Sequence, residues 1–159
     1  MVGTQFGGMF AVFSYIAPVV TDVANMPVTM VPVILVIFGV GMNVGNLVGS
    51  KLADMSLMGT IGGMLAFNVA IMLMFATTSA NPYLLCLSVF LVGCTFAAGP
   101  AVQTRLMDVA DGAQTLAAAS MHSAFNIANA LGAWLGGLVI AGGFGYASTG
   151  YVGAVLSLP

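Results

Sequence analysis

The chain has 159 residues and a formal net charge of −2, and 60% of its residues are hydrophobic. Only 4% are charged, whereas soluble domains carry about 25% charged residues, so the composition excludes a water-facing globule and indicates a protein of the lipid bilayer. With Lys and Arg together numbering 2, an extended nucleic-acid-binding surface is excluded as well.

Five apolar stretches follow one another along the chain, each long enough to predict a membrane-spanning helix. Helices are expected because an unclosed strand would leave backbone groups unpaired in hydrocarbon, and a spanning helix needs about 20 apolar residues. The predicted spans are residues 3–20, 29–49, 59–75, 83–102 and 115–141. The connectors between them carry most of the polar residues, and we expect them to be loops, among them residues 50–58 and 103–114.

The last nine residues are apolar but too few to cross a membrane. As a helix, residues 151–159 would reach only about 13 Å, against a hydrocarbon core of about 30 Å, which predicts a truncated sixth span. The expected fold class is therefore an all-α membrane protein, a polytopic helical bundle of five full spans and a truncated sixth, with residues 1–159 as one unit.

The basic residues predict an orientation in the membrane. Lys51 lies in the connector 50–58 and Arg105 in the connector 103–114, and an alternating path through the bilayer places these connectors on the same side. The positive-inside rule then predicts that both connectors and the N-terminus are cytoplasmic.

Asparagines form a polar face on two of the predicted spans. Asn43 and Asn46 share a face of the second span, and Asn126 and Asn129 share a face of the fifth. Polar side chains in a span usually face the bundle interior or a wet cavity. Two interpretations stay open: the asparagines line a pathway for a polar solute, or they are interhelical contacts that stabilise packing.

His122 is the one ionisable residue expected below the membrane interface. It could relay a proton, or it could be neutral and donate a hydrogen bond to a helix carbonyl or to Asn126. Ser123 and His122 point about 100° apart on a helix and cannot easily form a nucleophile–base pair. Metal, nucleotide and phosphate signatures are absent from the sequence, so we expect neither an enzyme nor a cofactor or metal site.

The segment GSKLAD (Gly49–Asp54) resembles a cytoplasmic signature of major facilitator superfamily transporters, Gly-x-Leu-Ala-Asp-Arg-x-Gly-Arg, of which a degenerate copy often follows their eighth helix. Residues 52–54 match the centre of this signature. Ser50 stands where the first glycine belongs and Met55 where the arginine belongs, and the trailing basic residues are missing.

Other segments resemble the same family. Met121–Tyr146 is similar to the eleventh helix of bacterial drug-efflux members of the arabinose-efflux and chloramphenicol-resistance type. Gln103–Ala110 resembles the connector before that helix, and Phe6–Val20 resembles the seventh helix. The resemblance covers essentially the whole chain and implies the C-terminal six-helix half of a twelve-helix secondary transporter, with the twelfth helix truncated.

The resemblance also implies roles for individual residues. In this fold two halves rock about a site near the membrane midplane; the first and fourth helices of each half line the central cavity, and the second and fifth line the interface between the halves. The implied substrate-path candidates are Gln5, Ser14, Tyr15 and Cys94. The implied candidates for the interface between halves, or for gating, are Asn43, Asn46, His122, Asn126 and Asn129.

Charged residues near the two cytoplasmic connectors are candidates for a gate. These are Lys51, Asp54, Arg105 and Asp108. Asp54 could cap the incoming helix or pair with Arg105 and so hold cytoplasmic helix ends together in one state. Alternatively, the charged residues only set topology and contact lipid headgroups.

Taken together, these features predict part of a secondary active transporter in a bacterial inner membrane. We expect it to export small amphipathic or weakly polar molecules by proton-coupled antiport with alternating access. Its expected partners are the lipid bilayer, an N-terminal six-helix half, the small-molecule solute and protons, with no nucleic acid. Two alternatives remain: a non-transporting membrane fragment, and a small homo-oligomeric channel that assembles through its Asn- and Gly-rich helix faces.

Overall fold

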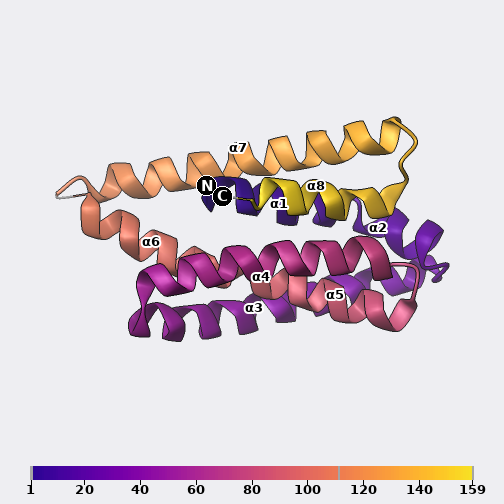
Figure 1. Cartoon of the computed structure of the whole chain (residues 1–159), viewed down its shortest axis with the longest axis horizontal. Coiled ribbons are helices and arrows are strands. Elements are labelled where there is room, and N and C mark those ends of the chain that lie inside the picture. Colours follow the sequence, from indigo (N-terminus) through magenta and orange to yellow (C-terminus); the bar gives the residue numbers. More distant parts are fainter. Residues whose placement is uncertain (1, 111, 159) are drawn as a thin grey trace.

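The computed structural model describes residues 2–110 and 112–158, with side chains from Phe6 onward. Within these residues the chain forms helices joined by short turns, and no strand (Figure 1). The longer helices are α1 (Val2–Phe13), α3 (Val31–Met55), α4 (Leu57–Thr78), α5 (Pro82–Cys94), α6 (Ala98–Val109), α7 (Gln114–Ala141) and α8 (Thr149–Leu156). The short elements are α2 (Ile16–Pro18), a π-helical turn (Val19–Val23) and 3₁₀ turns at Val28–Met30, Thr95–Ala97 and Tyr146–Ser148.

Four of the described helices are long and apolar enough to cross a membrane. They are Val28–Met55, Leu57–Thr78, Pro82–Val109 and Gln114–Ala141. A fifth candidate is the pair Phe6–Phe13 and Ile16–Val23, whose axes differ by 53°. These helices coincide, in chain order, with the five stretches that the sequence predicts as spans. The eight residues of α8 extend only about 12 Å.

The prediction of loops at residues 50–58 and 103–114 is wrong for most of both segments. α3 continues to Met55 and α4 begins at Leu57, while α6 continues to Val109. Neither helix extension contains proline or glycine, and leucine, alanine, methionine, lysine and arginine favour helix. Polar residues therefore end the apolar run without ending the helix. The turn between α3 and α4 is Ser56, whose hydroxyl accepts a hydrogen bond from the backbone N–H of Gly59 at 3.3 Å.

Two prolines coincide with irregular winding. Pro18 cannot donate a hydrogen bond to the carbonyl of Ser14, and the first span bends next to that residue before continuing as a π-helical turn. Pro100 likewise leaves the carbonyl of Phe96 without its usual helical donor, and Thr95–Ala97 winds as 3₁₀ helix between α5 and α6. Both irregular points lie beside the cavities described below.

Glycines bring α3 and α5 into backbone contact. A methyl group at Gly45 would stand 2.5 Å from the carbonyl oxygen of Cys94, closer than packed atoms approach. Gly41 and Gly49, one turn to either side on α3, also face α5 and the 3₁₀ turn after it without room for a side chain. Small residues at this spacing let two helix backbones approach closely, as is typical of membrane helix packing.

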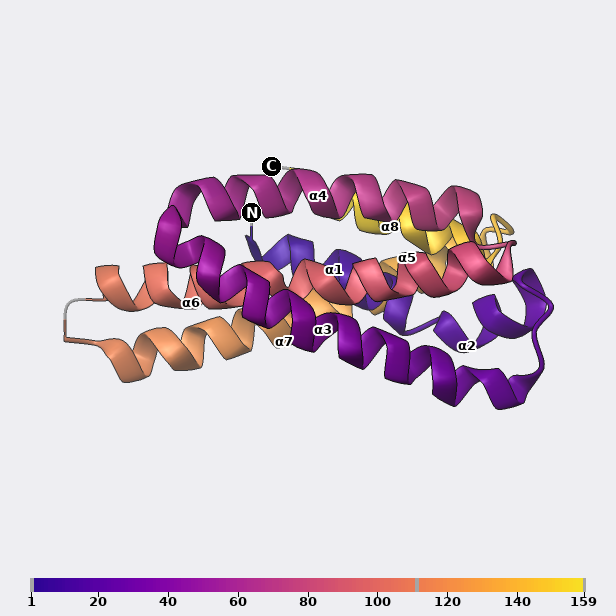
Figure 2. The same ribbon diagram turned by 90° about the horizontal axis from the view of Figure 1, so that it is seen from below.

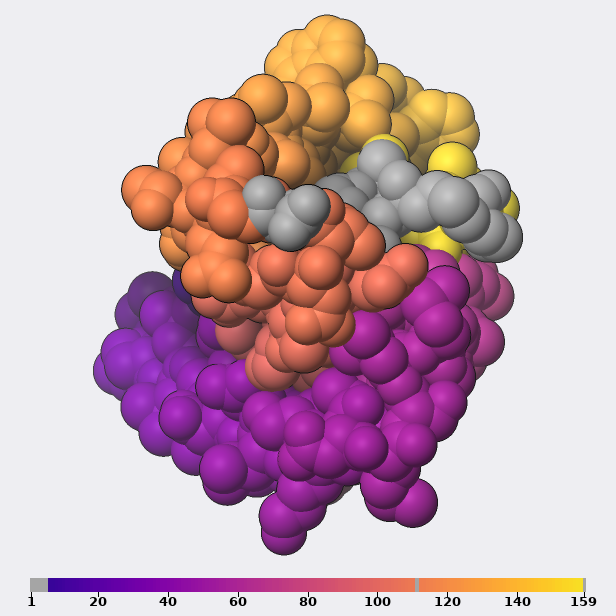
Figure 3. Space-filling model, turned by 90° about the vertical axis from the view of Figure 1, so that its left-hand side faces the viewer, coloured from indigo at the N-terminus to yellow at the C-terminus, as the bar shows by residue number. Residues whose placement is uncertain are grey.

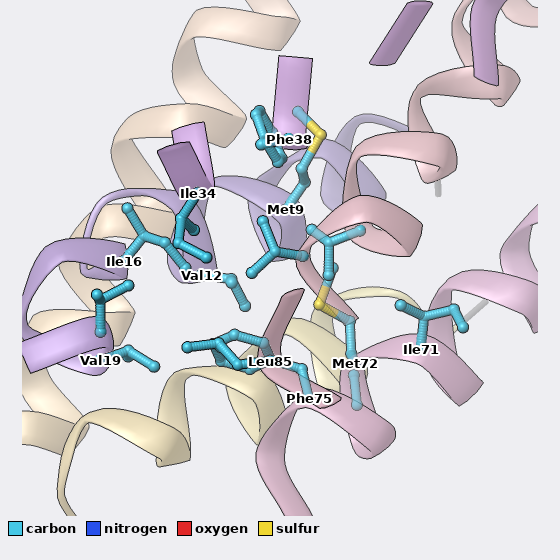
Figure 4. Packing of buried hydrophobic residues seen from close by; sticks show 14 of the residues in the cluster. Met9, Val12, Ile16, Val19, Ile34, Phe38, Ile71, Met72, Phe75 and Leu85 are labelled. Atoms are coloured by element: carbon cyan, nitrogen blue, oxygen red, sulfur yellow. The ribbon is translucent and has the colours of Figure 1, made fainter. Parts of the chain in front are cut away.

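The remaining helices pack around α1, which contacts α7 and α8, while α4 contacts α5 and α8. The GAWLGG segment of α7 packs closely against α1, because a methyl group at Gly132 would collide with the backbone of Gly7. Asn68 of α4 makes a hydrogen bond across this packing, because its side-chain nitrogen donates to the hydroxyl of Ser157, just after α8, at 3.0 Å. Figure 4 shows the buried core between these helices, where Met9 and Met72 lie among aliphatic side chains and Phe75.

The turns lie at two opposite ends of the bundle (Figures 1 and 2). One end carries the α3–α4 and α6–α7 turns, and Figure 3 looks at this end, with α6 and the start of α7 above and α3–α4 below. The other end carries the α4–α5 and α7–α8 turns and the segment before α3. Lys51 is near the end of α3 and Arg105 is near the end of α6. Both residues therefore lie at the same end of the bundle.

Candidate functional site

A cavity of about 250 Å³ lies where α1, α3, α6 and α7 come together. Its lining combines apolar and polar side chains from these helices and from the 3₁₀ turn before α6. The lining residues are Phe6, Asn46, Phe96, Gly99, Pro100, Gln103, Met121, His122 and Phe125. The fold thus brings together Asn46 of α3 and His122 of α7, two residues singled out from the sequence as interface or gating candidates.

Three phenylalanine rings form the apolar wall of this cavity. The ring of Phe6 lies edge-to-face to Phe96 and to Phe125, with centroids 5.7 Å and 5.1 Å away. Phe96 and Phe125 are themselves perpendicular, at 6.4 Å. The rings come from three separate segments, so edge-to-face contacts join α1, the 3₁₀ turn and α7 beside the polar groups.

Three polar side chains complete the lining: Asn46, Gln103 and His122. All three residues are exposed, and their side chains form no hydrogen bond among the residues that the structure describes. Their amide and imidazole groups can donate and accept hydrogen bonds, so the cavity offers unused polar groups next to an aromatic wall.

A second cavity, of about 490 Å³, lies on the same side of α1 near the bend of the first span. Ser14 and Asn129 supply its polar side chains, and the lining is otherwise apolar, with Phe10 and Phe13 among its residues. Ser14 is a substrate-path candidate and Asn129 an interface candidate, so this cavity also joins residues from both predicted groups. Phe10 contacts Phe125 edge-to-face at 5.2 Å, which places aromatic rings between the two cavities.

The asparagine faces of α3 and α7 are largely uncovered. Asn43, Asn46 and Asn126 are exposed and Asn129 is half-buried. The side-chain nitrogen of Asn43 donates to the carbonyl of Gly39, on its own helix, at 2.8 Å. Within the described residues none of these asparagine side chains hydrogen-bonds to another helix, so the close packing of this chain relies on its glycines and on Asn68 instead.

The remaining substrate-path candidates are Tyr15, Cys94 and Gln5. The hydroxyl of Tyr15 donates to the carbonyl of Ala133 on α7 at 2.8 Å, and Cys94 lies at the contact between α5 and α3. Neither residue lines either of the two cavities. Gln5 falls in the first turns of α1, where the side chains lie outside the described residues.

The charged candidates all lie at the end of the bundle that carries the α3–α4 and α6–α7 turns. Lys51, Asp54, Arg105 and Asp108 are exposed. Asp54 and Arg105 make no ion pair within the part of the chain that the structure describes, and the cap of α4 is Ser56 rather than Asp54. Among the described residues, no ion pair therefore joins the helices at this end of the bundle.

Sequence reasoning missed Gln103 and the phenylalanines of the first cavity. Gln103 was expected in a loop, whereas it lies on α6, one turn after Pro100. The phenylalanines look like ordinary span residues in the sequence. A usable indication for Phe125 was its position beside Asn126 on the polar part of the fifth span.

Curated transport proteins match almost the whole chain. The inner membrane transport protein YdhP of Escherichia coli K12 is 39% identical over 152 residues, which is 95% of this chain and 39% of that protein. The MFS-type transporter YfhI of Bacillus subtilis is 31% identical over 138 residues, 86% of this chain and 35% of that protein. A chloramphenicol resistance protein of Streptomyces lividans is 34% identical over 148 residues, 91% of this chain and 36% of that protein.

These matches cover the chain but only part of each relative. The chain spans about two fifths of the length of the curated relatives it matches. No family model matches the sequence, and no solved structure matches it. The identity to named transporters runs through the whole set of apolar helices, so the chain is similar over nearly all of its length to transporters that include an MFS-type, or major facilitator superfamily, member.

Proposed function

We propose that the chain is the C-terminal six-helix half of a secondary active transporter that exports small molecules across a bacterial inner membrane. Export would proceed by alternating access, with protons moving in the opposite direction. The proposal is supported by the similarity to transporters about two and a half times as long, of which this chain matches 39%, and by the row of apolar helices.

The observation that carries the proposal is the uncovered polar face on one side of the bundle. Asn43 and Asn46 of α3 and Asn126 of α7 are exposed there, and the two cavities open beside them. A polar surface at membrane depth is costly against lipid, so it is stable when another protein surface or water covers it. An N-terminal half that packs on α3 and α7 would cover it and would close the cavities into a solute path.

The charged end of the bundle supports an orientation in the membrane. With Lys51 and Arg105 at the same end, the positive-inside rule favours a cytoplasmic location for that end and for the N-terminus. Asp54 and Arg105, unpaired with each other in this arrangement, would meet in a state in which the ends of α3 and α6 approach.

The cavity linings favour amphipathic or weakly polar solutes. Both are mainly apolar, with a few amide, hydroxyl and imidazole groups and no carboxylate or basic Lys or Arg side chain. The name of the Streptomyces relative, a chloramphenicol resistance protein, is compatible with export of a small drug. Neither cavity has Asp or Glu in its lining, so the carboxylate that exchanges the proton would belong to the N-terminal half, and His122, the one histidine of the chain, would be the ionisable group of the first cavity.

Solute flux in liposomes tests this proposal. We would compare three preparations under an imposed pH gradient: this chain alone, this chain co-expressed with a six-helix N-terminal half, and the two halves joined in one polypeptide. Radiolabelled chloramphenicol serves as the first solute, and a protonophore provides the control. The joined and co-expressed forms should show flux that the protonophore abolishes, and the chain alone should show none.

Two outcomes would contradict the proposal. Flux through the chain alone would favour a homo-oligomeric channel assembled through the exposed asparagine faces. Failure of every preparation across a panel of small drugs, with the protein folded and inserted, would favour a membrane fragment whose exposed faces serve only for assembly.

A further inference from the structure

The structure points to the class of solute that the first cavity holds, and this inference rests on the proposed function because it concerns the same face. We infer that the cavity between α1, α3, α6 and α7 binds a neutral aromatic group that carries a hydrogen-bonding substituent such as an amide or hydroxyl. The volume of the cavity, the geometry of its phenylalanine rings and the kind of polar side chain in its lining each support this assignment.

The volume suits a single ring with one small substituent. The cavity measures about 250 Å³, whereas an apolar cavity of about 150 Å³ is enough to hold benzene. A larger amphipathic molecule would place only its aromatic end here and extend toward the neighbouring 490 Å³ cavity at Ser14 and Asn129.

The wall of the cavity already shows the packing that a further ring would join. Phe6, Phe96 and Phe125 meet edge-to-face at 5.1–6.4 Å between centroids. Aromatic rings prefer this edge-to-face arrangement, or an offset one, over a face-to-face sandwich. The three rings come from separate segments, so an aromatic ligand would contact three helical segments at once.

The polar part of the lining offers hydrogen-bonding groups but no carboxylate, Lys or Arg side chain. Asn46, Gln103 and His122 line the cavity, and their side chains have no hydrogen-bond partner among the residues that the structure describes. The charged residues Lys51 and Arg105 do not line it. An ionised ligand would lose hydration and find no Asp, Glu, Lys or Arg side chain in the lining to pair with, whereas a neutral amide or hydroxyl would satisfy these donors and acceptors.

Binding of three fluorinated probes to this chain in lipid nanodiscs, followed by ¹⁹F NMR line broadening, tests the assignment without requiring transport. The probes are 4-fluorobenzamide, which is neutral and aromatic, 4-fluorobenzoate, which is charged, and 4,4-difluorocyclohexanecarboxamide, which has the amide without the aromatic ring. We expect the benzamide to bind at least about tenfold more tightly than the benzoate and about three- to tenfold more tightly than the cyclohexane amide.

Variants locate the site. Phe125→Leu should weaken benzamide binding about three- to tenfold, whereas Phe67→Leu, which removes a ring on α4 outside both cavities, should leave it unchanged. Gln103→Leu should weaken binding of both amides, with Thr104→Val as the control at the next residue. Because Gln103 is exposed, this pair remains informative if Phe125→Leu disturbs folding.

The inference is overturned if the benzoate binds as tightly as the benzamide, or if Phe125→Leu and Gln103→Leu behave like their controls. The binding assay is independent of the flux assay. Loss of selective binding with intact flux in the complete protein would therefore reject the aromatic site alone, while selective binding without flux in any form would reject the transporter proposal alone.

Discussion

The hydroxyl of Tyr15 donates a hydrogen bond of 2.8 Å to the backbone carbonyl of Ala133, across 118 positions of sequence. Tyr15 lies at the break between α1 and α2, and its ring lies against Gly136 and Gly137 of α7. The two glycines leave the space that the ring occupies. The bend of the first span is therefore attached to α7 at this point.

Replacement of Tyr15 by Phe should destabilise the fold through loss of this one hydrogen bond. The free energy of unfolding should fall by about 0.6–1.5 kcal/mol, measured by equilibrium unfolding in SDS–detergent mixtures. Tyr83→Phe is the matched control, because the side chain of Tyr83 is 87% exposed. Equal stability of the two variants would show that the Tyr15 hydrogen bond contributes nothing.

A methyl group at Gly45 should separate α3 from α5. Gly45→Ala places that methyl against the carbonyl of Cys94, and overpacking of this kind costs about 1–3 kcal/mol. Gly39→Ala on the same helix has nothing within 4 Å of the added methyl, so it should be neutral or slightly stabilising because alanine favours helix. The same unfolding assay checks both, and a Gly45→Ala variant as stable as Gly39→Ala would disprove the close contact.

Removal of the Ser157 hydroxyl should loosen the attachment of α8 to α4. Ser157→Ala takes away the acceptor of one hydrogen bond from the buried Asn68 side chain, and loss of one such hydrogen bond costs about 0.5–1.5 kcal/mol. Hydrogen exchange in the α8 amides should accelerate in the variant. The exposed Ser123→Ala provides the control, and unchanged exchange in α8 would contradict the prediction.

The exposed asparagine face should matter to transport rather than to stability. Asn126→Leu should change the unfolding free energy of this chain by no more than about 0.5 kcal/mol, because the side chain is exposed. In the joined twelve-helix form, the same variant should reduce proton-driven flux. Trp134→Leu, on another exposed part of α7, should leave flux unchanged; equal flux in both variants would argue against an interface at Asn126.

The sequence predicts the long helices well because hydrocarbon imposes one requirement on every span, namely about 20 apolar residues with all backbone groups paired. It predicts the helix ends poorly, because the end of an apolar run is not the end of a helix. Residues such as Lys51 and Arg105 end the apolar run, but they favour helix, so α3 and α6 continue past the expected boundary.

The candidate site could be predicted only in part. Asn46 and His122 were recognisable because polar side chains are rare in such a composition. The wall of Phe6, Phe96 and Phe125 was not, since phenylalanine is ordinary in a span and the three rings meet only through the packing of separate segments. The hydrogen bond from Tyr15 to α7 could not be predicted for the same reason, because it forms only through the packing of two helices that are far apart in the sequence.

Labelling of introduced cysteines in intact cells tests most directly whether these helices alternate through the membrane with the charged end inside. In a chain with Cys86 and Cys94 replaced by alanine, Lys51→Cys and Arg105→Cys report on one end and Ala80→Cys on the other. A membrane-impermeant maleimide should label Ala80→Cys from outside and reach the other two only in everted vesicles. Labelling of Lys51→Cys and Arg105→Cys from opposite sides would contradict the account.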